Sequence, residues 1–444
     1  MHMSNSINQA YKEANIVTVF AGIILLLAII AHCGGYLHYE SSAFILNYTA
    51  ERPFWNIIFD PDKNDWGCYQ CRELSYIFDY IDAHIVLFFL KNKLIWFVSP
   101  ISICLMIFCI WLQQYAGRRL CPNLPSCFFT FHAIAMALLP FFTENIFFRS
   151  SKPLVAASIG VLIFGTALAH LKRPGVWGNT KTLAIAALVA VLSDRQGVFF
   201  VTAFAGVLAI EQFFHPFAVR SAILKISIST VLISIVANVW IVPPIIEALN
   251  GYFPNFSYQT DFVLTPFFVI DGFKFTMANL SNVFTGINFL SLAIPVGVAL
   301  FCLLTFLLKN HKHISPFLFI ETTIIVIVCA GIMTSRHAAL MDEKVMFSGY
   351  FMPSMMIFSF FYLIAMNNLP EKLKKWIYVL PILAIVLRLY PYIYPEMLFI
   401  EDDDQKIYQD ATIKLKHVIK NPEVDHKMLT LPYRVDMLIE KLPK

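Results

Sequence analysis

Long apolar runs separated by polar connections occupy most of this chain. A hydrocarbon core about 30 Å thick requires roughly 20 apolar residues in a helix, because unpaired backbone groups cannot face lipid. Eleven runs meet this requirement, some of them narrowly, so the pattern predicts an all-α integral membrane protein with about eleven transmembrane helices. The predicted spans are 16–35, 94–115, 126–143, 153–170, 179–193, 197–214, 222–247, 285–308, 315–334, 348–366 and 375–391. Pro243 and Pro244 are expected to break the seventh span before a loop.

If these helices alternate in direction, the long polar segments all lie on one side of the membrane. They are 36–93, 248–284, 335–347 and the tail from about 392. The short connections on the other side collect arginine and lysine, which predicts that this other side is cytoplasmic. The amino terminus is therefore expected inside, and the carboxyl tail on the outer, periplasmic face of a bacterial inner membrane. Glu211 and Glu321, at inner helix ends, are interpreted as structural.

Two units follow from this layout: a transmembrane domain over 1–391 and an extracytoplasmic segment over 392–444. The tail has a soluble composition. Asp404 can cap a helix in which apolar residues recur at three- to four-residue spacing. They are Ile407, Ala411, Leu415 and Val418.

The first long polar segment, 36–93, contains an amphipathic stretch that predicts a juxtamembrane helix over 72–90. On a helix, Leu74, Ile77, Phe78, Ile81 and Ile85 gather on one side, and Arg72, Ser75, Asp79 and Asp82 on the other. We expect the apolar side to face the membrane and the acidic side to face water or another loop.

Composition supports a membrane protein and excludes some partners. The 444 residues are 58% hydrophobic and 14% charged, and the net charge of +4 forms no long basic tract, so no nucleic-acid partner is expected. Among nine cysteines, Cys68 and Cys71 form a CxxC without histidine or further cysteine nearby. No metal site is predicted from them; a disulfide or two free thiols are the open alternatives.

Carboxylates crowd the same polar segment in "FDPDKNDWG", which supplies Asp60, Asp62 and Asp65. Neighbouring carboxylates at a lipid boundary raise one another's pKa by repulsion and lost solvation, which tunes a base toward neutral pH. One of them, or Glu73 just beyond, is therefore a candidate catalytic base. A calcium-like oxygen cluster or an ordinary polar turn is the structural alternative.

Cations recur in the other outer connections. "TENIFFRSSKP" supplies Glu144, Arg149 and Lys152, "LSDRQG" supplies Asp194 and Arg195, and "SRHAALMDEK" supplies Arg336, His337 and Lys344. Arginine suits phosphate because its planar fork donates two parallel hydrogen bonds. The predicted substrate-binding set is Arg72, Asp79, Arg149, Lys152, Asp194, Arg195, Arg336, His337 and Lys344. An internal pair such as Asp194 with Arg149, or a solvated loop for the last group, is the alternative.

Cations beside a carboxylate base on one membrane face favour one reaction class: sugar transfer from a lipid phosphate. The base deprotonates an acceptor hydroxyl, whose oxygen attacks the anomeric carbon, and the phosphate leaves with inversion. Cations stabilise the negative charge that grows on the phosphate in the transition state.

The layout resembles the GT-C superfamily of membrane glycosyltransferases over about the first 200 residues. The resemblance lies in the acidic first outer segment, the helix "RELSYIFDYID" after it, and the acidic then basic "TENIFFRSSKP". The resemblance is one of architecture and does not include a sequence signature. It implies polyprenyl-phosphate sugar donors, Asp65 or a neighbour as the base and Glu144 as the second acid. The chain is similar to bacterial glucosyltransferases of O-antigen and the cell envelope, which act on lipopolysaccharide and related glycan acceptors.

The sequence departs from two branches of that superfamily. It lacks the adjacent Asp-Glu pair that protein mannosyltransferases have in the first loop, and it lacks the WWD-type motif of oligosaccharyltransferases. No cofactor is predicted, and a divalent cation is left open. The rival interpretations are a transporter or a lipid or polysaccharide flippase, and a protein similar to O-antigen ligases or polymerases. A transporter should place charges near the bilayer midplane and often has internal repeats, whereas here the charges gather at one surface.

Overall fold

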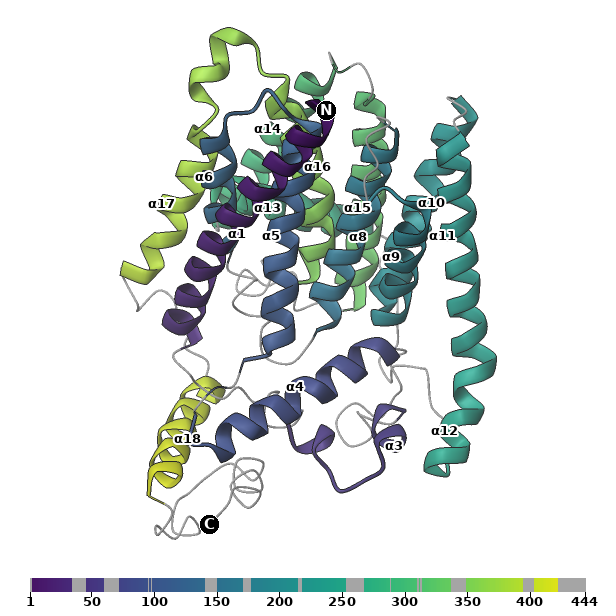
Figure 1. Ribbon diagram of the computed structural model, residues 1–444, viewed down its shortest axis with the longest axis vertical. Coiled ribbons are helices and arrows are strands. Elements are labelled where there is room, and N and C mark those ends of the chain that lie inside the picture. Colours follow the sequence, from purple (N-terminus) through teal and green to yellow (C-terminus); the bar gives the residue numbers. More distant parts are fainter. Residues whose placement is uncertain are drawn as a thin grey trace.

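The fold was analysed in a computed structural model of the chain. It describes residues 2–33, 45–59, 72–94, 96, 98–139, 150–170, 177–214, 218–252, 267–287, 289–309, 311, 314–336, 349–393 and 403–421. These residues form sixteen α-helices, a π-helical turn and two short 3-10 turns, and no strand occurs among them (Figure 1). The predicted all-α class is confirmed for this part of the chain.

The helices follow one another with short connections wherever the chain is described. Their bounds are α1 (His2–Cys33), α3 (Phe54–Ile58), α4 (Glu73–Lys91), α5 (Pro100–Leu120), α6 (Ser126–Ala137), α8 (Ser151–His170), α9 (Thr180–Ser193), α10 (Arg195–Phe214), α11 (Ala218–Val236), α12 (Val242–Asn250), α13 (Phe268–Thr285), α14 (Leu290–Leu308), α15 (Pro316–Arg336), α16 (Met352–Asn367), α17 (Val379–Ile393) and α18 (Asp403–Lys420).

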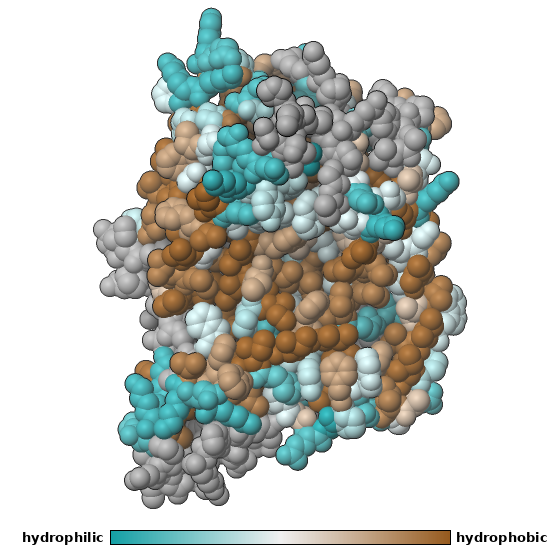
Figure 2. Space-filling view, viewed as in Figure 1, coloured by the Kyte–Doolittle hydropathy of each residue, from teal (hydrophilic) through white to brown (hydrophobic). Residues whose placement is uncertain are grey.

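Eight helical stretches in the described residues are long and apolar enough to cross a membrane: Asn8–Ala31, Pro100–Leu120, Ser151–His170, Arg195–Phe214, Ser221–Asn250, Leu290–Leu308, Pro316–Ser335 and Gly349–Asn367. Figure 2 shows apolar side chains in a broad band over the middle of the molecule and polar ones toward both ends. The chain is therefore an integral membrane protein. The remaining three predicted spans form the shorter helices α6, α9 and α17, and the eleven-crossing topology stays a prediction.

Helix α13 corrects the prediction of a polar loop over 248–284. From Phe275 to Thr285 it is completely buried, and it packs on α14, α15 and α17. A Cβ atom on Gly272 would overlap the carbonyl oxygen of Ile327, and one on Gly331 would overlap that of Phe268. These glycines let α13 and α15 cross in backbone contact, a packing mode common in membranes. The helix contains Asp271, Lys274 and several buried amides and hydroxyls, which interrupt its apolar run.

The prolines of the seventh span do not end it. A π-helical turn over Ala237–Ile241 joins α11 to α12, and Pro243 lies in the first turn of α12. Proline is tolerated there because the first N–H groups of a helix need no partner within it. The predicted break is therefore a local change of helical winding, and the helix continues to Asn250.

Helix α4 lies across one end of the bundle, called here the α4 end, and the first turn of α1 lies at the opposite end (Figure 1). A second hydrophobic core, separate from that of the bundle, fills the α4 end. It joins Tyr76 and Val86 of α4 to Ile246 of α12 and Leu415 of α18. Ala411, Leu415 and Val418 of the tail helix are buried as their spacing predicted; the side chain of Ile407 lies outside the described residues.

Candidate functional site

The polar side of α4 faces the bundle. Ser75, Asp79 and Asp82 are buried, whereas Ile81 and Phe88 on the apolar side are 41% and 62% exposed. The predicted amphipathic helix exists. Of the two predicted orientations of its polar side, the one toward water is wrong, whereas the one toward another loop agrees with contacts to Ser150 and Ser193. Helix α4 lies across the end of the bundle where α5 and α8 begin. The first N–H groups of those helices need acceptors, which the polar side of α4 supplies.

Asp82 supplies such acceptors to α5. One carboxylate oxygen accepts the N–H of Ile101 at 3.0 Å, and the other accepts the hydroxyl of Ser99, the N-cap residue of α5. Burial raises the pKa of Asp82 to about 7, although both hydrogen bonds act to lower it. This carboxyl is absent from the predicted site residues. Its place on the polar side of the 72–90 helix, three residues after Asp79, is the signal that could have found it.

Asp79 does the same for α8. Its Oδ1 accepts the N–H of Ser150 at 3.0 Å and the hydroxyl of Ser150 at 2.8 Å, immediately before the helix begins. One turn earlier, Ser75 donates its hydroxyl to the carbonyl oxygen of Ser193 at 2.6 Å, at the end of α9. The polar side of α4 therefore holds the ends of three bundle helices in register.

A buried charge cluster adjoins this contact, and we call Arg72, Lys152 and Asp194 the Asp194 cluster. Asp194 Oδ2 lies 3.0 Å from Arg72 Nε and 3.2 Å from Lys152 Nζ. Lys152 and Asp194 side chains are each 3% exposed, and that of Arg72 is 15% exposed. Lys152 Nζ also lies 4.3 Å from the ring centroid of Tyr350, a cation–π distance.

Burial alone would raise the pKa of Asp194. Arg72, Lys152 and the N–H of Gln196, which donates to Oδ1 at 2.8 Å, outweigh burial and hold this pKa well below its usual range. Asp194 is therefore an anion at any physiological pH. The predicted alternative of an internal ion pair holds for Asp194, but the partners seen are Lys152 and Arg72. Arg149 lies outside the described residues.

The sequence "LSDRQG" shapes the turn that presents Asp194. The residue has an extended backbone between the last turn of α9 and the first turn of α10, so its side chain caps α10. A Cβ atom on Gly197 would overlap the carbonyl oxygen of Ala190. Glycine is required there because the two helices meet backbone to backbone at the turn.

The structure brings four of the predicted binding residues together: Arg72, Asp79, Lys152 and Asp194. Glu73 begins α4 and Arg195 begins α10, both half-buried at this end. Arg336 ends α15. The remaining predicted residues lie outside the described part of the chain, as does the side chain of Arg336. They are Asp60, Asp62, Asp65, Glu144, Arg149, His337 and Lys344, with Cys68 and Cys71 of the CxxC.

The described ends of three polar segments converge here. Arg72, where the chain resumes after 60–71, contacts Asp194, and Ser150, where it resumes after 140–149, contacts Asp79. Tyr350, just beyond 337–348, faces Lys152. Met333, before that segment, accepts a hydrogen bond from the amide of Gln196. The described residues include no group of three or more histidine, cysteine or acidic side chains placed to hold a metal ion.

Comparison with known proteins gives no relative from which a function could be transferred: no protein-family model, curated protein or solved structure matches the chain.

Proposed function

We propose that the protein is a glycosyltransferase that moves a sugar from a polyprenyl-phosphate donor to an envelope glycan acceptor, such as O-antigen, at the α4 end of the bundle. That end would then face the periplasm. The observation that carries the proposal is the buried Asp194 cluster, with two cations around one carboxylate, where the bundle meets a juxtamembrane helix.

The cluster suits an anionic group. Its three formal charges, those of Arg72, Lys152 and Asp194, sum to +1. Helices α5, α8 and α10 all begin at the α4 end, and helix amino termini carry a partial positive charge. A lipid phosphate at the membrane boundary would meet these dipoles and the cluster together.

In the proposed reaction, a carboxylate of the first polar segment takes the proton of the acceptor hydroxyl. Asp65 is our first choice, with Asp60, Asp62 and Glu73 as alternatives, and Glu144 is the second acid. The acceptor oxygen forms a bond to the anomeric carbon as the bond from that carbon to the phosphate oxygen breaks. The lipid phosphate leaves with the electron pair, and Arg72 and Lys152 stabilise its growing charge.

The test is sugar transfer by purified protein in liposomes that contain polyprenyl phosphate glucose labelled in the sugar, with isolated cell-envelope glycan as acceptor. We expect label to enter the glycan with the wild type, and Asp65→Asn to abolish transfer without loss of expression. Glu51→Gln, an exposed carboxylate of the same polar segment, is the matched control and should stay active. Failure of the wild type with every polyprenyl-phosphate hexose tried would contradict the proposal.

A second candidate, a transporter or flippase, is favoured by one feature. Helices α6 and α13 both end inside the bundle, where the Arg388 guanidinium donates to the carbonyl oxygens of Ala135, Asn282 and Val283. Transporters often build substrate sites at the ends of interrupted helices. Movement of labelled polyprenyl phosphate glucose across the same liposomes, with no sugar transfer, would select this candidate. Transfer of a whole glycan instead of one sugar would select a ligase or polymerase.

A further inference from the structure

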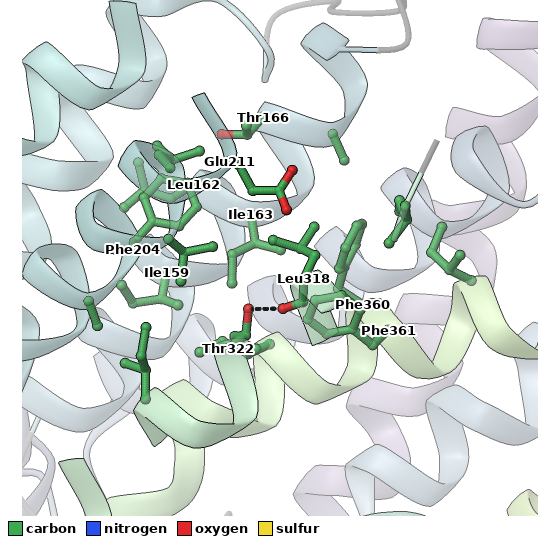
Figure 3. A pocket seen from close by; sticks show the side chains of 18 of the residues that line it. Ile159, Leu162, Ile163, Thr166, Phe204, Glu211, Leu318, Thr322, Phe360 and Phe361 are labelled. Atoms are coloured by element: carbon green, nitrogen blue, oxygen red, sulfur yellow. Dashed lines mark hydrogen bonds between the residues drawn. The ribbon is translucent and has the colours of Figure 1, made fainter. Parts of the chain in front are cut away.

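An apolar pocket of about 120 Å³ lies between α8, α10, α15 and α16, away from the α4 end. Figure 3 shows Ile159, Leu162, Phe204 and Phe361 around it, with the carboxylate of Glu211 directed into the same space. The Thr322 hydroxyl is bound at 2.6 Å to the carbonyl oxygen of Leu318 in its own helix, so it adds no demand for a polar ligand.

The pocket has the length of one membrane leaflet. It follows α10 from Phe200 to Glu211, three turns of helix or roughly 16 Å, which is about half of a 30 Å hydrocarbon core. Since α10 begins at the α4 end, Glu211 lies toward the opposite end. Exposed Phe213 and Phe317, at 83% and 70%, mark the surrounding surface as lipid-facing.

The polar groups of the pocket gather at this far end. Glu211, His170 and His311 line it there, and every other lining residue except Thr166 and Thr322 is apolar. Glu211 is 8% exposed and interacts electrostatically with the carboxylate of Glu321 on the neighbouring α15. His311 accepts the N–H of Ile314 at Nδ1 at 3.0 Å, which fixes the orientation of its ring.

We propose that this pocket binds one acyl chain of a phospholipid with a primary-amine headgroup, of the phosphatidylethanolamine class, from the leaflet opposite the α4 end. Part of the chain fills the apolar pocket, and the ammonium group meets the carboxylate of Glu211. An amine is selected because the Glu211 carboxylate at the end of the apolar pocket favours a cation and repels a purely anionic headgroup. The site is independent of the reaction proposed for the α4 end.

The experiment is native mass spectrometry of the full-length protein after exchange into detergent with equal amounts of phosphatidylethanolamine and phosphatidylglycerol of identical chains. Three variants are compared with the wild type. Glu211→Gln removes the headgroup contact, and Ala203→Phe fills the apolar length. Gly206→Phe adds the same ring to the same helix, where a Cβ atom has nothing within 4 Å.

We expect the wild type and Gly206→Phe to retain the ethanolamine lipid over the glycerol lipid by roughly tenfold, the ratio expected from one charge-assisted hydrogen bond. Glu211→Gln should lose the preference but keep lipid, and Ala203→Phe should lose bound lipid. Equal retention of the two lipids by the wild type, or unchanged retention by Ala203→Phe with its melting temperature preserved, would overturn the proposal.

Discussion

Lys152 Nζ lies 3.2 Å from Asp194 Oδ2, and both side chains are almost completely removed from solvent. The pair links the first turn of α8 to the turn between α9 and α10, and Arg72 ties it to the start of α4. Residues that were predicted to bind substrate therefore form a structural joint. The two roles are separable, because Arg72 is the most exposed member and the buried pair stays neutral without it.

Lys152→Met should destabilise the protein by about 3 kcal/mol or more, since it removes one of two cations from a buried carboxylate. Lys152→Met combined with Asp194→Asn should recover much of that loss, because the charge then left in the cluster is that of Arg72, its most exposed member. Thermal unfolding of the two single variants and the double variant in detergent measures this coupling. Additive losses would show that the pair contributes nothing to the joint.

The stability of the protein should depend on pH through Asp82. Its pKa is about 7 in the folded state and near 3.8 in the unfolded chain, so the folded state binds more protons between these values. The stability that Asp82 contributes is complete below about pH 4 and is lost as the pH rises through 7. At most about 4 kcal/mol is involved, from the size of the shift.

Asp82→Asn isolates this effect, because the asparagine side chain can still accept the N–H of Ile101 and donate to Ser99. We expect melting temperatures of wild type and variant to diverge between pH 5 and pH 8, with the variant favoured at the higher pH. A constant difference across this range would mean that Asp82 does not titrate there.

Gly197→Ala should destabilise the protein by about 3 kcal/mol, the upper range for overpacking, because the added methyl group must displace α10 from Ala190. Gly206→Ala on the same helix is the control, with open space around its Cβ. The control should be neutral or slightly stabilising, since alanine favours helix. Equal melting temperatures for both variants would show that the close approach at Gly197 carries no strain.

Most of the bundle could be predicted from apolar run length, and the helix at 72–90 from its periodicity. Periodicity shows that α4 has a polar face and an apolar face, but it does not show which face packs against the bundle. That depends on the helix starts at Ser99 and Ser150, which are far away in the sequence. Helix α13 was missed for a related reason: Asn279 and Asn282 are buried between helices, and a hydropathy average treats a buried amide as an exposed one.

The charge cluster could be predicted in part. Residue types at the outer turns indicated Lys152, Asp194 and Arg72, since buried ionisable groups at membrane depth need partners. Their pairing could not be derived, because it follows from the way α8, α9 and α10 pack at Gly197. Asp82 was placed on the polar side of the helix but not among the predicted site residues, because its raised pKa arises from burial against α5, a distant element of the chain.

Binding of polyprenyl phosphate to the purified protein tests the central claim most directly, with Arg72→Gln compared against Lys91→Gln, an exposed cation at the other end of α4. We predict that the wild type and Lys91→Gln bind the lipid equally. Arg72→Gln should bind it roughly tenfold more weakly, as expected for the loss of one charge-assisted contact, with its melting temperature little changed. No binding by the wild type, or equal binding by all three proteins, would contradict the assignment of the Asp194 cluster to a lipid phosphate.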